Sequence, residues 1–270
     1  MKKKSKGILS KIVLALVLIF FYLPIIHIIV FSFNGDKSVI KLDGFSLQWY
    51  ERLFSDRDML MSIFYTVVIA VIATVVSTVV GTVTAIGLSK SKKWLQTCVE
   101  QVNNLPVLNP EIVTAIGLMM LFTAFAVEKG FLTLLLAHIM FCTPYVMLSV
   151  TPKLRRLDPN IMDAAMDLGA TPMQALTKVI VPQIMPGIIS GALIAFTMSF
   201  DDFIISYFVS GNGVQNISIY VYAMGKRMNP SVNALSTLVI IVVVLALTLV
   251  NVVPMIKEHR EKKKEALARA

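Results

Sequence analysis

Three carboxyl residues lie within otherwise apolar stretches of this sequence: Glu111 in LNPEIV, and the adjacent pair Asp201 and Asp202 in SFDDF. Placing an ionised acid at the centre of a lipid bilayer costs about 3 kcal/mol even on insertion scales, so such residues mark functional sites. An acid on a transport pathway would bind a cationic solute. Instead of lying on a pathway, Glu111 could lie at the inner membrane interface. For the aspartate pair, the counter-charge could come from a lysine of another subunit instead of a solute.

Helical geometry separates the roles of the two adjacent aspartates. Consecutive residues of a helix point about 100° apart, so at most one acid of the pair faces a central pathway squarely. The other is expected to face a neighbouring helix or to cap a helix break. At about 1.5 Å per residue counted from Pro186, Asp201 lies roughly 22 Å into its span.

Two other residues are candidates for the same chemistry. Trp49 precedes a short helix expected over 51–54, where it serves either as an interfacial anchor or as an aromatic face for a passing cation. His138 lies mid-span, and packing with an interhelical hydrogen bond is favoured over a proton relay.

The elements that carry these residues are membrane-spanning helices. Of the 270 residues, 56% are hydrophobic and only 15% are charged, with a mean hydropathy of +0.77. A bilayer core needs about 20 apolar helical residues. Six segments qualify and predict an all-α polytopic membrane protein: 8–33, 62–88, 95–127, 131–150, 184–208 and 234–256. We expect the first to be a retained helix, since it is too long for a signal peptide.

Basic residues set the expected orientation. They gather at the amino terminus, around 90–93, around 153–178 and in the tail 257–270. The positive-inside rule therefore places both termini in the cytoplasm. We expect one permease-like domain over 1–256 followed by a charged cytoplasmic tail. The net charge of +9 then belongs to the inner membrane face and gives no argument for nucleic-acid binding.

The third span carries an interruption, LPVLNPE, in which Pro106 and Pro110 break the hydrogen-bond ladder. Non-helical backbone at membrane depth is tolerated only where it is buried in protein or lines a cavity. This segment therefore predicts a broken helix beside a pathway.

The stretch 157–187 between the fourth and fifth spans carries two helix start signals. Asp158 as the N-cap residue and Pro159 in the first turn predict one short helix that stops at Gly169. Thr171 and Gln174 predict a capping box for a second. Two short, well-capped helices at a membrane surface indicate a docking point for a partner.

Motifs for catalysis are missing from the sequence. It contains no GxxxxGK[ST], HExxH or GxSxG pattern and no metal-ligand spacing. We therefore expect a transport protein without cofactor, metal or catalytic residues, powered by a separate subunit.

The docking stretch resembles the cytoplasmic loop of permease subunits of ABC importers, which reads EAA, three residues, G, nine residues, I-x-L-P. Here the pattern stands as Asp163-Ala164-Ala165, Gly169, Val179, Val181 and Pro182, with Asp in place of Glu. The resemblance implies the MetI-like permease fold with six helices. It also implies that Asp163, Ala164, Ala165, Gly169 and Pro182 couple the chain to an ATPase dimer.

Other segments are similar to the PotC-type permeases of spermidine/putrescine importers: FSFNG, NPEIVTAIGL, AHIMFCTPYV, SFDDFIISYFVSG and MNPSVNALSTL. This resemblance implies a polyamine pathway involving Trp49, Glu111, Ser199, Asp201 and Asp202. It also implies a second permease of PotB type, an extracytoplasmic polyamine-binding protein and a location in the cytoplasmic membrane.

Three alternatives remain open at this stage. The chain could belong to an ABC importer for another solute. It could be an ATP-independent transporter that uses Glu111, His138, Asp201 and Asp202 as a relay. A membrane-bound enzyme is the third alternative, and no recognisable catalytic constellation supports it.

Overall fold

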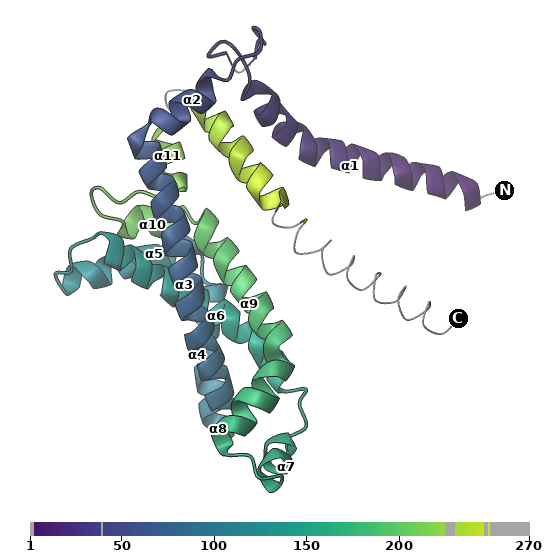
Figure 1. Ribbon diagram of the computed structural model, residues 1–270, viewed down its shortest axis with the longest axis vertical. Coiled ribbons are helices and arrows are strands. Elements are labelled where there is room, and N and C mark those ends of the chain that lie inside the picture. Colours follow the sequence, from purple (N-terminus) through teal and green to yellow (C-terminus); the bar gives the residue numbers. More distant parts are fainter. Residues whose placement is uncertain (1–2, 39, 225–229, 246–247, 249–270) are drawn as a thin grey trace. The chain divides into compact units, whose positions relative to one another are not determined.

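The computed structural model describes residues 3–38, 40–224, 230–245 and 248 (Figure 1). This part of the chain is helical and contains no β-strand, only an isolated bridge between Asn34 and Phe45. The helices are α1 (Lys3–Phe31), α2 (Gln48–Ser55), α3 (Arg57–Ser89), α4 (Lys93–Leu108), α5 (Glu111–Ala124), α6 (Phe131–Leu154), α7 (Ile161–Asp167), α8 (Pro172–Ala175), α9 (Val181–Asp201), α10 (Ile204–Val209), α11 (Ile217–Met224) and a further helix, Ser231–Leu245.

The chain divides into two compact units, Met1–Arg57 with Met224–Ala270, and Asp58–Ala223. In the first unit, the loop after α1 is organised by the buried side chain of Asn34. Its amide donates to the carbonyls of Ser38 and Lys41, both at 2.8 Å, and its oxygen accepts from the backbone N–H of Asp43 at 2.7 Å. The short helix expected near Trp49 is confirmed as α2.

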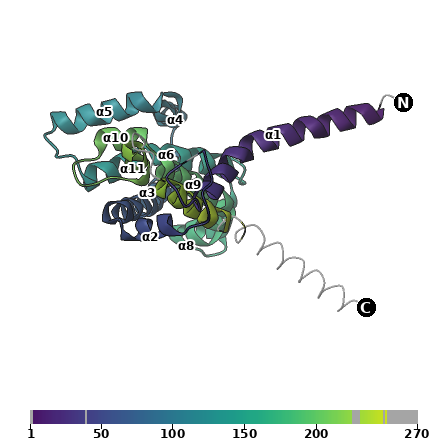
Figure 2. The ribbon, with the colours of Figure 1, turned by 90° about the horizontal axis from the view of Figure 1, so that it is seen from above.

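The second unit is built around α6. Helix α9 packs along α6, and α10 lies beside α5, as both views show (Figure 1 and Figure 2). A β-carbon added at Gly191 of α9 would come within 3.0 Å of the Val146 Cα, and one at Gly81 of α3 within 2.9 Å of the Val146 Cβ. Small residues thus let both helices approach α6 closely, which is how helices associate where lipid gives no hydrophobic drive.

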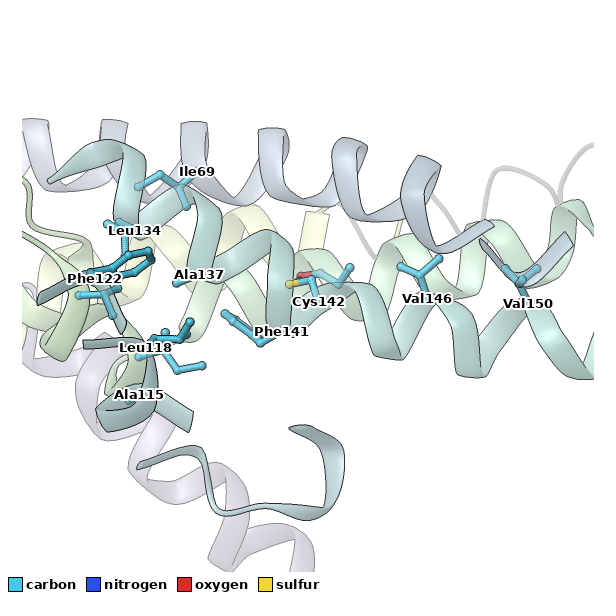
Figure 3. Close-up of a cluster of buried hydrophobic side chains, with 14 of the residues drawn as sticks. Ile69, Ala115, Leu118, Phe122, Leu134, Ala137, Phe141, Cys142, Val146 and Val150 are labelled. Carbon is cyan, nitrogen blue, oxygen red and sulfur yellow. Dashed lines mark hydrogen bonds between the residues drawn. The ribbon is translucent and has the colours of Figure 1, made fainter. Parts of the chain in front are cut away.

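A buried apolar cluster follows the length of α6 (Figure 3). Leu134, Ala137 and Phe141 lie on one side of the helix, and residues such as Ile69 of α3 belong to the same cluster. Their spacing of three and four residues is that of one helix face, whereas Val146 points to another face, where glycines of α3 and α9 approach it. The cluster fixes α6 as the element against which the site residues are placed.

Four described helices are long and apolar enough to span a membrane: Ser10–Phe31, Arg57–Ser89, Phe131–Leu154 and Pro172–Asp201. A fifth span is possible if α4 and α5, bent by 107° at their junction, count as one. The predicted interruption of the third span is therefore present. It falls at Asn109 and Pro110 only, because Asn109 takes the extended conformation (φ −79°, ψ 145°) that residues before proline prefer, while Pro106 stays inside α4.

The fifth expected span, 184–208, is not one continuous helix, and the break lies at the aspartate pair, where a break was one of the two alternatives. Helix α9 ends at Asp201, and α10 begins only at Ile204. Asp202 is extended (φ −60°, ψ 128°), so the chain turns there before the helical conformation resumes. At the other end, a π-helical turn over Leu176–Ile180 joins α8 to α9, giving a continuous helix from Pro172 to Asp201.

The last expected span, 234–256, is described only through its first half, as the apolar helix Ser231–Leu245. The predicted tail, 257–270, lies outside the described residues. The stretch between the last two expected spans, 209–233, contains a helix that was not predicted, α11. The count of six spans and the cytoplasmic termini stay predictions.

Candidate functional site

The docking stretch has the predicted turn at its centre. Gly169 adopts φ +89°, in the left-handed region that favours glycine, and ends α7. The N–H groups of Gly169 and Ala170 donate to the carbonyls of Met166 and Ala165 at 2.8 and 3.1 Å. These bonds satisfy carbonyls that a helix end otherwise leaves unpaired, so the turn is held by its own backbone.

The predicted capping box is confirmed. The N–H of Gln174 donates to the Thr171 hydroxyl oxygen at 3.3 Å, and the N–H of Thr171 donates to the Gln174 side-chain oxygen at 3.0 Å. The box does not open a separate short helix, however. It opens the long helix that ends at Asp201, because the π-helical turn carries the chain on without a break.

The predicted N-cap role of Asp158 is wrong. Helix α7 begins at Ile161, with Asn160 as the N-cap residue. The Asp158 carboxylate instead accepts from the N–H of Asn160 at 2.9 Å, forming a turn that precedes the helix. Aspartate forms such turns as readily as it caps helices, and the sequence alone does not distinguish the two.

The residues of the coupling motif gather on an accessible surface. Asp163, Ala164, Gly169 and Pro182 are exposed, and Ala165 is partly so. Two apolar side chains beside the turn were missed by the sequence reasoning: Leu168 is 91% exposed and Met173 is 67% exposed. Their signal was their place on either side of the predicted Gly169 turn.

A cavity of about 360 Å³ opens between the ends of α3 and α6, the start of α4 and the chain entering α7. Its charged lining residues are Lys90, Glu100, Arg155 and Asp158. Arg155 and Glu100 form an ion pair at 2.5 Å, in which the Arg155 side chain is 65% exposed. An exposed pair of this kind contributes at most about 1 kcal/mol.

Glu111 is the first residue of α5, directly after the break, and is exposed. It lines a narrow cavity with Tyr145 of α6, Met198 of α9 and Ile205 of α10. The broken span therefore brings this acid to the same side of α6 as the break between α9 and α10.

The two adjacent aspartates face different surroundings, as helical geometry predicts. Asp201, at the end of α9, is exposed. Asp202 is only 8% exposed, and its carboxylate caps α10: it accepts from the N–H of Ile205 at 3.2 Å and from the N–H and hydroxyl of Ser206, both at 2.7 Å. The expectation that one acid would cap a helix break is confirmed for Asp202.

His138 makes the interhelical hydrogen bonds that were favoured for it. Its Nδ1 lies 2.7 Å from the Ser199 hydroxyl and its Nε2 lies 3.0 Å from the Ser206 hydroxyl. Nε2 is also 3.5 Å from the Asp202 carboxylate, a proximity that 64 residues of sequence separation conceal. Ser199 is itself buried, at 2% exposure.

Asn216 completes this buried group, and the sequence reasoning missed it. Its amide donates to the Asp202 carbonyl at 2.7 Å and to the Ser206 hydroxyl at 2.8 Å. Its side-chain oxygen accepts from the N–H of Ile219 at 2.9 Å, so it also caps α11. An asparagine just before an apolar stretch is a recognisable helix start signal.

Trp49 is buried, with 1% of its surface exposed. Its indole N–H donates to the Asn34 carbonyl at 2.6 Å, and the Arg52 guanidinium lies 5.0 Å from the ring centroid. This geometry ties α2 to the loop organised by Asn34. Trp49 therefore anchors α2 within the protein, and its predicted place at the membrane interface stays a prediction.

An aromatic group follows Asp201 on α10 and α11. The Phe203 ring lies 5.6 Å from that of Tyr207 and 4.9 Å from that of Tyr222. Tyr207 and Tyr222 are 51% and 60% exposed. A hydrogen bond from the Ser218 hydroxyl to the Asp201 carbonyl, 3.4 Å, links α11 to the end of α9.

Residues 77–257 match the family described as the binding-protein-dependent transport system inner membrane component. The chain belongs to this family. It is 35% identical to the spermidine/putrescine transport system permease protein PotC of Haemophilus influenzae, over 91% of this chain and 95% of the relative. It is 36% identical to the putrescine transport system permease protein PotI of Escherichia coli K12, over 85% of this chain and 84% of that relative.

The permease fold is also found among solved structures. A chain of a bacterial ABC transporter involved in the import of the acidic polysaccharide alginate matches with a TM-score of 0.72 at 14% identity, covering 93% of this permease and 96% of that chain. Such low identity shows the shared fold alone. The protein is therefore an all-helical, multi-pass membrane permease, a transport subunit.

Proposed function

We propose that this permease forms the pathway of an ATP-driven importer for polyamines, spermidine or putrescine, in the cytoplasmic membrane. The observation that carries the proposal is the exposed carboxylate of Asp201 at the end of a membrane-spanning helix, followed on α10 and α11 by exposed tyrosine rings. The names of the relatives, PotC and PotI, support the same class of substrate.

Polyamines are chains of spaced ammonium groups, and this chemistry fits the exposed acids. An ammonium 4 Å from a carboxylate gains up to about 4 kcal/mol at an effective dielectric of 20, before desolvation. An exposed aromatic face adds about 0.5–1 kcal/mol by cation–π attraction. Glu111 lies at the second break, so two acids at two helix breaks would bind two ammonium groups in succession.

The five residues of the predicted pathway differ in exposure. Glu111 and Asp201 are exposed, whereas Trp49, Ser199 and Asp202 are buried. We infer that the exposed pair contacts the polyamine. The buried three act on the shape of the segments that carry the pathway.

We further propose that an ABC ATPase dimer docks on the turn between α7 and α8. Leu168 and Met173 offer exposed apolar side chains that a complementary groove would cover, and Asp163 and Asp167 add charges for orientation. A second permease of PotB type and an extracytoplasmic polyamine-binding protein complete the importer. The alginate transporter has been solved in complex with a periplasmic protein, which supports the general arrangement.

The test is uptake of radiolabelled spermidine into proteoliposomes that hold the permease with its second subunit and binding protein, with and without the ATPase. We expect ATP-dependent uptake that excess putrescine reduces and that an anionic solute such as thiosulfate does not. ATP-dependent uptake of thiosulfate instead of polyamine would overturn the substrate class. Polyamine uptake without the ATPase would overturn the ABC mechanism in favour of a secondary transporter.

A further inference from the structure

The break between α9 and α10 is held by a group of buried polar side chains, none of which contacts the polyamine in the proposed function. We call His138, Ser199, Asp202, Ser206 and Asn216 the break network. Each of the five is at most 8% exposed. They come from α6, α9, α10 and the chain before α11, so four segments meet at one point.

The donors and acceptors of the break network match one another. Because an ionised Asp202 can only accept, the single hydroxyl hydrogen of Ser206 goes to its carboxylate. The Ser206 oxygen then accepts from the Asn216 amide and from His138 Nε2, which must carry the hydrogen. His138 Nδ1 is left as an acceptor for the Ser199 hydroxyl. A neutral imidazole thus uses both of its nitrogens.

This arrangement uses three of the roughly four acceptor positions of the Asp202 carboxylate, and the residue is buried, so a solute ammonium has little access to it. One oxygen accepts from the N–H of Ile205, and the other accepts two bonds from Ser206 and faces His138 at 3.5 Å. A polyamine ammonium that made more than one hydrogen bond here would have to displace helix-capping bonds from a buried group. Each such loss costs about 1–3 kcal/mol.

The break network does reach the neighbouring acid through the backbone. The Asn216 amide donates a hydrogen bond to the Asp202 carbonyl. The hydroxyl of Ser218, two residues later, donates to the Asp201 carbonyl at 3.4 Å. The peptide units on both sides of the break are therefore tied to α11. The direction in which α9 ends, and with it the exposed side chain of Asp201, depends on these bonds.

We propose that His138 and Asn216 are positioning residues for the polyamine pathway. Together with Asp202 they hold the break so that the Asp201 carboxylate faces the substrate, and Asp202 itself does not bind polyamine. The proposal rests on the proposed function for the identity of the substrate, but the geometry of the break network does not depend on it.

The kinetic test compares positioning with binding in the reconstituted importer. In Asp201→Asn we expect KM to rise about tenfold with the melting temperature unchanged, because only the binding charge is lost. In His138→Leu and Asn216→Ala we expect KM to rise by a smaller factor, about threefold, together with a lowered melting temperature, because the bonds that hold the break and orient the Asp201 carboxylate are lost.

Conservative variants provide the controls. His138→Gln keeps one donor and one acceptor and should return KM close to that of the unmodified importer. Ser199→Ala should raise KM, whereas Thr197→Ala, two residues earlier on α9, should not, since within the described part of the chain the Thr197 hydroxyl bonds only to the Leu193 carbonyl of its own helix, at 2.9 Å.

A second readout needs no polyamine. In a variant with Cys98 and Cys142 replaced by alanine, Asp201→Cys is labelled with a charged thiol reagent, and Asn216→Ala is then added. Asn216→Ala should change the labelling rate by at least about threefold, since it frees the peptide carbonyl of Asp202. Unchanged labelling, or an Asp202→Asn variant with raised KM and unchanged melting temperature, would overturn the positioning role. Loss of all polyamine uptake by the unmodified importer would overturn only the proposed function.

Discussion

The long helix from Pro172 to Asp201 ends in two breaks of opposite character. At its start, the turn around Gly169 is exposed and held by hydrogen bonds between residues three to five apart in sequence. At its end, the break at Asp202 is buried and held by partners 61 and 68 residues apart. The start of the helix is therefore stabilised by bonds within its own segment, whereas its end also depends on bonds to other helices of the bundle.

This difference suits two different tasks. A turn that holds itself together can be gripped from outside without support from the bundle, as a docking site requires. A break that depends on several helices changes whenever those helices move against one another. The comparison teaches that a single helix can carry a rigid contact at one end and a conformationally sensitive one at the other.

The largest expected effect comes from breaking the exposed end. Proline fixes φ near −65°, whereas Gly169 needs φ +89°, so Gly169→Pro cannot form the turn. We expect loss of ATPase co-purification and at least about a tenfold loss of uptake, with little change in melting temperature, because the turn makes few contacts with the bundle. Retained co-purification would show that the docking surface lies elsewhere.

The helix between the two ends is the next target. Gly191→Leu would force α9 away from α6, since even a β-carbon at this position lies 3.0 Å from the Val146 Cα. Such overpacking destabilises by about 1–3 kcal/mol, measurable as a lowered melting temperature in detergent. Ser190→Leu, at the exposed neighbouring position, is the matched control and should have no such effect. Equal effects of the two variants would contradict the packing argument.

A smaller effect is expected at the other broken span. Glu111→Gln removes the exposed charge at the start of α5 and keeps the size of the side chain. The attraction to an ammonium group that is lost in a well-solvated site is about 1 kcal/mol, so KM for spermidine should rise several-fold. The maximum rate and ATPase co-purification should stay unchanged. If KM is unaffected, only the acid at the α9–α10 break contributes to binding, and the proposed succession of two acids fails.

The two breaks also show which structures the sequence can predict. The Gly169 turn and the Thr171–Gln174 box depend on neighbours, so residue types and spacing predicted both. The break at Asn109 and Pro110 was predicted for the same reason, since proline restricts its predecessor. One acid of the pair Asp201 and Asp202 was expected either to face a neighbouring helix or to cap a break. Which of the two acids would do so depended on His138 and Asn216, whose distance along the chain hides their contact.

Two misses have the same physical origin. The end of α9 at Asp201 was hidden because the apolar character continues through Phe203 to Phe208, so hydropathy gives no boundary. The extended residue at position 202 is stabilised by the local capping bonds from Ile205 and Ser206 together with the long-range bonds of the break network. The π-helical turn over Leu176–Ile180 likewise has no local signal, and its extra residue makes two predicted segments one helix.

The smallest expected effect tests whether the exposed turn around Gly169 is stabilised by its own local hydrogen bonds. Thr171→Ala removes the hydroxyl that accepts from Gln174 but leaves Gly169 and the backbone bonds in place. An exposed cap of this kind contributes about 0.5–1 kcal/mol. Since that energy is local, we expect about a twofold loss of ATPase binding and no change in the KM for spermidine. A changed KM would mean that the capping box influences the far end of the helix, and the two breaks would then be coupled through α9 rather than independent.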